Sequence, residues 1–195
     1  MGNKQRRPLS TSADTVSKLA NAHKYLTIKE KKAIKKTWIR LGVLQEKFIR
    51  DIWLLCAERS PRIRAILQLD EEPNGGADRF DLLVSLVQEF FDRLILYWKL
   101  DDEKILEESY ILGVEHGHLH ESWFQSIFWD IFLASMADTV AGVQMANISS
   151  AKLAFAKYSW RKFAQIVIGQ MLEAFTEFRS GVMTKTVPST AVSLI

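Results

Sequence analysis

Three of the four histidines in the chain lie within one ten-residue segment, and they have the clearest capacity for chemistry. The segment ILGVEHGHLH contains His116, His118 and His120. His116 and His120 are four residues apart, so on a helix they would share a face and could clamp a zinc ion. A zinc site needs further ligands, however, and the only cysteine, Cys56, lies far away in an apolar run. The alternatives are a polar helix end, where positive charge is favourable, and a ligand for a larger cofactor.

The composition predicts a soluble, cytoplasmic protein with a single domain. The chain has 195 residues, of which 48% are hydrophobic, and this is enough for one ordinary core. A net charge of +3 is too small to indicate nucleic-acid binding by itself. One cysteine excludes an internal disulfide and suits a reducing compartment. The sequence has neither an apolar stretch long enough to cross a bilayer nor a secretory signal.

The sequence lacks the motifs of common enzymes. It contains no GxSxG, no glycine-rich phosphate loop and no paired carboxylates on one helical face of an expected cleft. Cys56 on an apolar helix face is typical of a core residue rather than of a nucleophile. We therefore do not predict an enzyme, although redox side reactions at a bound cofactor are compatible with the sequence.

Helical signals recur along the middle of the chain. Thr27 and Glu30 form a capping box at the start of the first predicted helix. Ser60-Pro61 closes the second helix and opens a short third one, with serine as cap and proline in the first turn. A Trp- and Phe-rich helix is predicted at about residues 121–138, and its outward part, which would include Trp129, could contact a partner.

The predicted organisation is a single helical domain between two tails. No segment alternates like a strand, so the fold class is all-α, with about seven helices over residues 27–179. Residues 1–26 are basic and poor in large apolar side chains, which predicts a flexible tail. Residues 180–195 are predicted to form a second flexible tail.

The order and spacing of these elements resemble the globin family over residues 27–178, and invertebrate globins, nematode ones in particular. LGVEH, residues 112–116, resembles the Leu-Gly-x-x-His motif whose histidine binds haem iron on the proximal side. Trp38 lies well inside the first helix, as a tryptophan often does in globins. Residues 158–175 resemble the last helix of the family, including its tryptophan near the start.

The resemblance implies a globin-like fold that binds haem b, with His116 as the iron ligand. Leu112 would lie on the same apolar stripe of the helix and line the haem pocket. We expect this helix to end near Gly117, which would leave His118 and His120 outside the site.

The distal side departs from the family pattern. Leu83 lies 33 residues before His116, where globins usually carry a distal histidine, and Val87 follows one turn later. Leu67 stands where the family almost always has a phenylalanine against the haem. Trp53 on the second helix is expected to face the same cavity. Leucine donates no hydrogen bond, so a polar ligand would be held weakly unless the indole N–H of Trp53 reaches it.

This pocket predicts a role other than oxygen storage. Sensing of a small diatomic ligand (oxygen, NO or CO), redox signalling, or electron transfer with a partner protein suits an apolar distal side better. The alternative is a globin fold that has lost haem and acts as an interaction module, because fold does not imply function.

The N-terminus MGNKQRR predicts a lipid anchor at Gly2. A Met-Gly start is typical of N-myristoylated proteins, although Arg6 stands where the usual motif has serine or threonine. Lys4, Arg6 and Arg7 would supply the electrostatic attraction that a single acyl chain needs for stable binding. We therefore expect peripheral association with the inner face of the plasma membrane; the alternative is an ordinary solvated tail.

Overall fold

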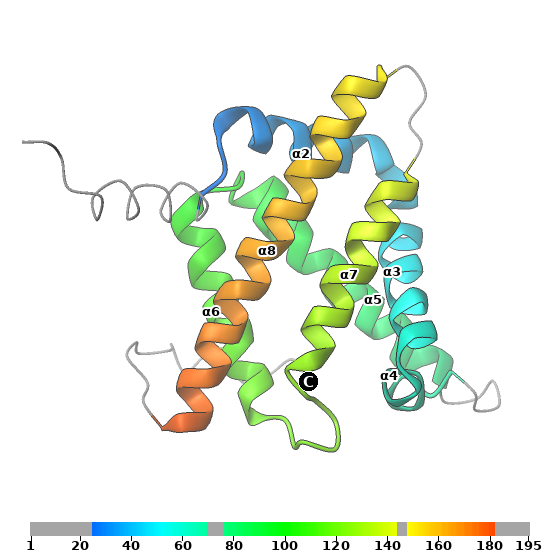
Figure 1. The fold of residues 1–195 in the computed structure, drawn as a ribbon, viewed down its shortest axis with the longest axis vertical. Coiled ribbons are helices and arrows are strands. Elements are labelled where there is room, and N and C mark those ends of the chain that lie inside the picture. The colour runs from blue at the N-terminus through cyan, green and yellow to red at the C-terminus, as the bar shows by residue number, and fades with distance from the viewer. Residues whose placement is uncertain (1–24, 70–75, 144–147, 182–195) are drawn as a thin grey trace, which may run out of the picture.

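The structure is a computed structural model that describes residues 25–69, 76–143 and 148–181. Every regular element in these ranges is helical, as Figure 1 shows. The elements are α2 (Ile28–Leu41), the 3-10 turn η1 (Gly42–Leu44), α3 (Gln45–Arg59), α4 (Pro61–Ile66), α5 (Gly76–Asp92), the π-turn η2 (Arg93–Tyr97), α6 (Asp102–His118), α7 (Ile127–Gly142) and α8 (Ser150–Ser180).

Two helix starts are confirmed as predicted, because their caps are local. The Glu30 amide donates to Thr27 Oγ1 at 3.3 Å, and the Thr27 amide donates to Glu30 Oε2 at 2.6 Å, which completes the capping box. At α4 the Ile63 amide donates to Ser60 Oγ at 3.2 Å, with Pro61 in the first turn. In each case the cap satisfies N–H groups that a helix start leaves free.

Of two predicted boundaries, one is confirmed and one is wrong. α6 ends at His118, one residue after Gly117, whereas the aromatic-rich helix begins at Ile127 rather than at about 121. After α6 the chain turns, because the amides of Trp123 and Phe124 both donate to the His120 carbonyl, at 2.8 and 3.1 Å. This turn places residues 121–124 outside the helix.

Position 117 within α6 requires glycine because α8 passes close to it. A Cβ at this position would lie 2.5 Å from Cδ1 of Phe178. At Gly113, one turn earlier, a Cβ would lie 2.3 Å from the Met171 carbonyl oxygen. These two glycines on one face of α6 allow the backbones of α6 and α8 to approach closely.

The long helix α8 organises one half of the domain, since it packs against α2, α6 and α7. In Figure 1 it runs across the front of the molecule between α6 and α7, with α2 crossing behind its upper part. α3 organises the other half and packs against α4, α5 and α7. α5 and α6, in contrast, make at most marginal backbone contact within the described ranges.

One main apolar cluster joins these helices into a single domain. Because all the described elements are helical, the predicted all-α class is confirmed. At its centre Trp38 is fully buried, with ring centroids 5.9 Å from Phe91 and 5.7 Å from Trp160. The Trp38 indole N–H donates to Asp92 at 2.7 Å, and that of Trp160 donates to Thr37 at 2.6 Å. The polar ends of these large side chains are therefore satisfied inside the core.

Candidate functional site

His116 lies in the last turns of α6, and its imidazole is held by its own helix. Nδ1 is 2.7 Å from the carbonyl oxygen of Leu112, four residues earlier. Because a carbonyl can only accept, Nδ1 carries the hydrogen and Nε2 keeps its lone pair. Part of the residue reaches the surface, but burial lowers the pKa of His116 below its ordinary value, against the opposing effect of the hydrogen bond to Leu112. The ring is therefore neutral near pH 7, with Nε2 available as a ligand.

Aromatic rings from three segments surround this imidazole. The ring centroid of Phe124 lies 4.8 Å away in an edge-on arrangement, and that of Trp129 lies 5.5 Å away. Phe175 on α8 closes the cluster at 5.7 Å from Phe124 and 5.3 Å from Trp129. These neighbours were not foreseen, because their association depends on where the turn after α6 delivers α7.

The expectation that Trp129 faces outward is wrong. Only 6% of Trp129 is exposed, whereas Trp123 and Ile127 are 54% and 52% exposed. The later start of α7 changes which residues face α8, so Trp129 belongs to the wall around His116. A partner would meet Trp123 and Ile127 instead.

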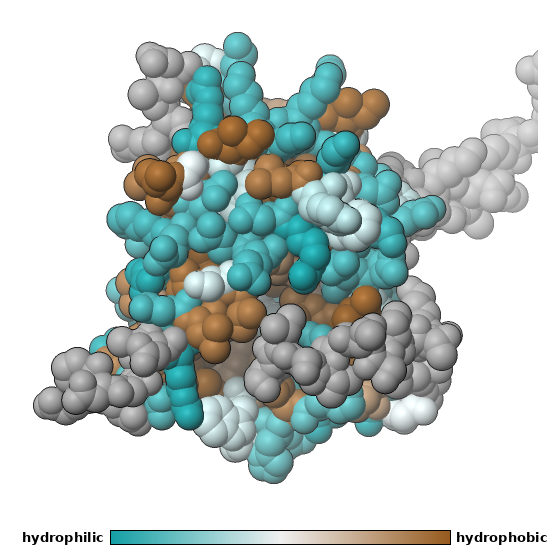
Figure 2. Space-filling model, turned by 180° about the vertical axis from the view of Figure 1, so that it is seen from behind, coloured by the Kyte–Doolittle hydropathy of each residue, from teal (hydrophilic) through white to brown (hydrophobic). Residues whose placement is uncertain are grey.

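The apolar residues assigned to the pocket belong to one cluster. Leu67 at the end of α4 is 7% exposed and lies in the main core, and the other four pack against that core while remaining only partly buried: Trp53, Leu83, Val87 and Leu112. Figure 2 shows the face on which α5 lies, where apolar side chains gather on both sides of a hollow in the lower half.

The side of this cluster formed by α5 offers no polar group at the assigned positions. Leu83 and Val87 are both aliphatic, so neither can donate a hydrogen bond or bind a metal. The adjacent positions Leu82 and Val84 do not change this, since Leu82 is 59% exposed and Val84 is fully buried.

Trp53 brings the only indole N–H found buried without a partner in the described part of the chain. Its ring packs on Phe132 of α7, with centroids 5.1 Å apart. The indoles of Trp38, Trp98 and Trp160 all donate to named acceptors, at 2.7, 3.3 and 2.6 Å. A buried donor without an acceptor costs about 1–3 kcal/mol, so its persistence at Trp53 calls for a reason.

The arrangement of side chains supports neither a cysteine nucleophile nor a zinc site at His116 and His120. Cys56 is fully buried, and burial raises the pKa of its thiol to about 11, so it is neither a nucleophile nor a ready metal ligand. His120 lies beyond the end of α6, exposed and hydrogen-bonded to Ser122 at 2.8 Å, so it does not share a helical face with His116. Within the described ranges no three His, Cys, Asp or Glu side chains come together as a metal site.

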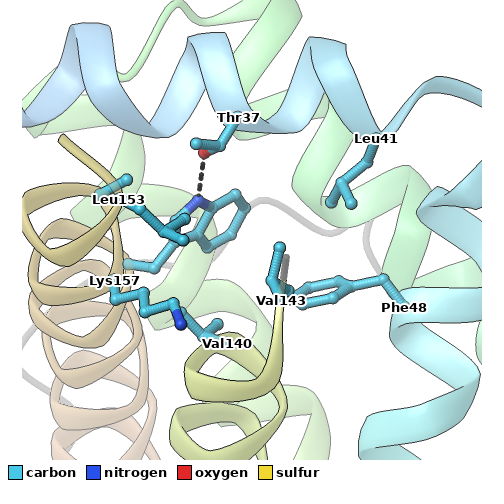
Figure 3. A pocket seen from close by; sticks show the side chains of 9 residues that line it. Thr37, Leu41, Phe48, Val140, Val143, Leu153 and Lys157 are labelled. Carbon is cyan, nitrogen blue, oxygen red and sulfur yellow. Dashed lines mark hydrogen bonds between the residues drawn. The ribbon is translucent and has the colours of Figure 1, made fainter. Parts of the chain in front are cut away.

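A small cavity lies between α2, α3, α7 and α8 (Figure 3). Its volume of about 20 Å³ holds roughly one water molecule. Its walls are mostly apolar and include Leu41, Phe48 and Val140. This cavity is far too small for a macrocyclic cofactor.

Gly2, the predicted lipidation site, lies outside the described residues, as do most of both predicted tails. None of the described helices has the length and apolar character required to cross a membrane. No protein-family model, curated protein or solved structure matches the chain.

Proposed function

We propose that the chain binds haem in the manner of a globin, with His116 as the iron ligand, and that it senses small diatomic molecules or exchanges electrons with a partner protein. The observation that carries the proposal is the hydrogen bond from His116 Nδ1 to the Leu112 carbonyl at 2.7 Å. Metal-binding histidines usually donate their second ring N–H to a carbonyl or carboxylate, which fixes the tautomer and orients the ring.

The protonation state of His116 supports the same role. A metal ligand must be neutral imidazole, and burial lowers the pKa of His116 in that direction. The aromatic rings of Phe124 and Trp129 limit the rotation of the imidazole. The side chain thus needs little reorganisation to act as a ligand.

The apolar residues assigned to the haem pocket are compatible with a large apolar group. Leu83, Val87 and Leu112 are only partly buried against the core, so they have apolar surface left for a cofactor to cover. Haem supplies an iron centre that binds diatomic molecules and changes oxidation state, tuned by the axial ligand and the polarity of the pocket.

The polarity of this lining argues against oxygen storage. α5 contributes only aliphatic groups at the assigned positions, so it cannot stabilise negative charge on a guest molecule. The indole N–H of Trp53 is buried and lacks an acceptor, which makes it the candidate donor to a polar guest. A pocket with a single neutral donor suits transient binding or electron exchange better than long retention.

The test is haem uptake by the full chain, followed by absorption spectroscopy in the oxidised and reduced states. Wild type is expected to take up one haem per chain with a Soret band, and to show the single broad visible band of a five-coordinate ferrous iron. His116→Ala should weaken haem binding by more than the roughly 10–100-fold that follows loss of a ligand's hydrogen-bond partner. Circular dichroism of the haem-free variant checks that the helices persist.

His118→Ala and His120→Ala are the matched controls, because both histidines are exposed and lie past the site. Both variants should retain haem. Equal loss in all three variants would contradict the single-ligand assignment. Failure of wild type to bind haem would leave the helical interaction module as the better account, and two sharp visible bands would reveal a sixth ligand.

A further inference from the structure

Helix α2 has a second face that points away from the domain. Its inner face buries Ile34, Thr37 and Trp38. Residues spaced three or four apart share a face of a helix. The side opposite the buried face therefore carries a set of exposed residues, which we call the α2 outer face. Its members are Ile28, Lys29, Lys32, Lys36 and Ile39, with Val43 in the 3-10 turn that follows.

Three large apolar side chains on this face are strongly exposed. Ile28 is 73% exposed, Ile39 is 55% exposed and Val43 is 97% exposed. Isolated exposed apolar residues are common, but three on one side of a single helix form a stripe. Figure 2 shows apolar side chains alternating with long hydrophilic ones along the upper edge of the molecule, where α2 lies.

The charge of this face is of one sign. α2 contains six basic residues and a single acid, Glu30. Glu30 is buried and paired with Lys162 of α8 at 3.1 Å, so its charge is used inside the domain. Lys31 points elsewhere and pairs with Asp102 at 2.7 Å. The α2 outer face itself therefore combines lysines with apolar side chains and carries no acid.

We propose that the α2 outer face binds the surface of an anionic lipid bilayer. Lysines near such a surface are attracted by phosphate and carboxylate headgroups, and short apolar side chains enter the boundary between headgroups and acyl chains. A second copy of the chain would bring like charges together. A nucleic acid would satisfy the lysines but would leave Ile39 and Val43 without an apolar environment.

The sequence leading into α2 strengthens the charge argument. Before Tyr25 it has a single acid, Asp14. It carries five further basic residues there: Lys4, Arg6, Arg7, Lys18 and Lys24. These residues are covalently joined to the N-terminal end of the same helix. The proposed surface needs neither acylation of Gly2 nor haem, so it stands apart from both.

The test is co-sedimentation of the full chain with vesicles, using Gly2→Ala protein so that acylation plays no part. One set of vesicles contains phosphatidylcholine alone, and the other contains roughly 30% phosphatidylserine, enough for a strongly negative surface potential. The protein is expected to bind the anionic vesicles, to release them in part in high salt, and to bind the neutral vesicles weakly.

The triple variant Lys29→Glu, Lys32→Glu, Lys36→Glu should lower the partition coefficient by at least about tenfold. The matched control reverses three exposed charges elsewhere, Lys47→Glu, Arg79→Glu and Lys99→Glu, and so changes the net charge by the same amount. It should lower the partition coefficient by less than about threefold, because these residues lie outside the α2 outer face. Ile39→Ser with Val43→Ser should remove the binding that persists in high salt. Both serine substitutions are at exposed positions and should leave the helical circular dichroism unchanged.

Equal losses in the two charge-reversal variants would overturn the proposal, since binding would then follow net charge rather than this face. Equal binding to neutral and anionic vesicles, or no binding to either, would overturn it as well. None of these outcomes depends on haem, so they are separate from the outcome of the haem-uptake test.

Discussion

At the scale of single residues, the tryptophans separate structural from functional roles. Trp38 and Trp160 lie in the core and donate to Asp92 and Thr37, so their indole N–H groups serve the fold. Trp53 packs as tightly on a neighbouring ring, but its N–H is buried without an acceptor. Retaining a polar group at such a site costs stability, which suggests that the group acts on a bound molecule.

Trp53→Phe tests this distinction in the haem-free protein. The variant removes a donor that is already unsatisfied, so its cost should be limited to lost packing. Trp160→Phe removes the same atoms together with a made hydrogen bond. We expect Trp53→Phe to lower the free energy of unfolding by about 1 kcal/mol less than Trp160→Phe does, as measured by urea denaturation. A larger loss at Trp53 would indicate a hydrogen bond in solution and would weaken its assignment as the distal donor.

At the scale of helices, two glycines allow α6 and α8 to approach closely. Gly113 and Gly117 lie on the face of α6 that α8 covers, and a methyl group at either position would meet Met171 or Phe178 at less than contact distance. His116 lies three residues after Gly113 and contacts the aromatic rings of the neighbouring segments. The helix that carries His116 is therefore packed against α8 at a distance that only glycine allows at these two positions.

Gly113→Ala should be destabilising although alanine is the better helix former. The added methyl would lie 2.3 Å from a backbone oxygen of α8, so the helices must separate. We expect a loss of about 1–3 kcal/mol in the free energy of unfolding. Gly169→Ala is the matched control within α8, where nothing lies within 4 Å of the new methyl, and it should stabilise the protein by about 0.5–1 kcal/mol. Stabilisation by both variants would show that the close approach is not maintained in solution.

At the scale of the whole molecule, α3 holds α5 while α8 holds α6, and the two supported helices make little contact with each other. Both helices also carry apolar side chains that are only partly buried, including Leu83 and Val87 on α5 and Leu112 on α6. The α2 outer face is likewise defined by the assembled domain, because the packing of Ile34, Thr37 and Trp38 decides which side of α2 remains in solvent.

The stability of the whole domain should depend on pH through His116. Burial lowers the pKa of this imidazole in the folded state, so the unfolded chain takes up a proton first as the pH falls through the ordinary histidine value. The free energy of unfolding should therefore be lower at pH 5.5 than at pH 7.5, by about 1 kcal/mol. The effect should be absent above the ordinary pKa, where both states are neutral.

Comparing His116→Gln with His120→Gln isolates this contribution. Urea denaturation at the two pH values should show a reduced pH dependence for His116→Gln and an unchanged one for His120→Gln. Burial also raises the pKa of Glu115, which acts in the opposite direction at lower pH, but this group is present in both variants. An identical pH dependence in the two variants would contradict a neutral, buried imidazole at His116.

The sequence by itself determined the features that depend on neighbours in the chain. The caps at Thr27 and Ser60 are confirmed because donor and acceptor lie three residues apart. The stripe containing Leu112 and His116 follows from helical spacing, and so does the hydrogen bond between them. That α5 carries aliphatic side chains at Leu83 and the adjacent positions follows from their identity alone.

The tertiary structure alone decided what depends on distant residues. The need for glycine at position 117 comes from Phe178, sixty-one positions later, which occupies the space that a side chain there would fill. Trp129 is buried because the rings of His116, Phe124 and Phe175, from α6, the turn after it and α8, lie against it. The unsatisfied indole N–H of Trp53 and the exposed face of α2 have the same origin. The packing of helices far apart in the sequence decides whether a side chain meets a hydrogen-bond partner or solvent. Local hydrogen bonding carries no information about that packing.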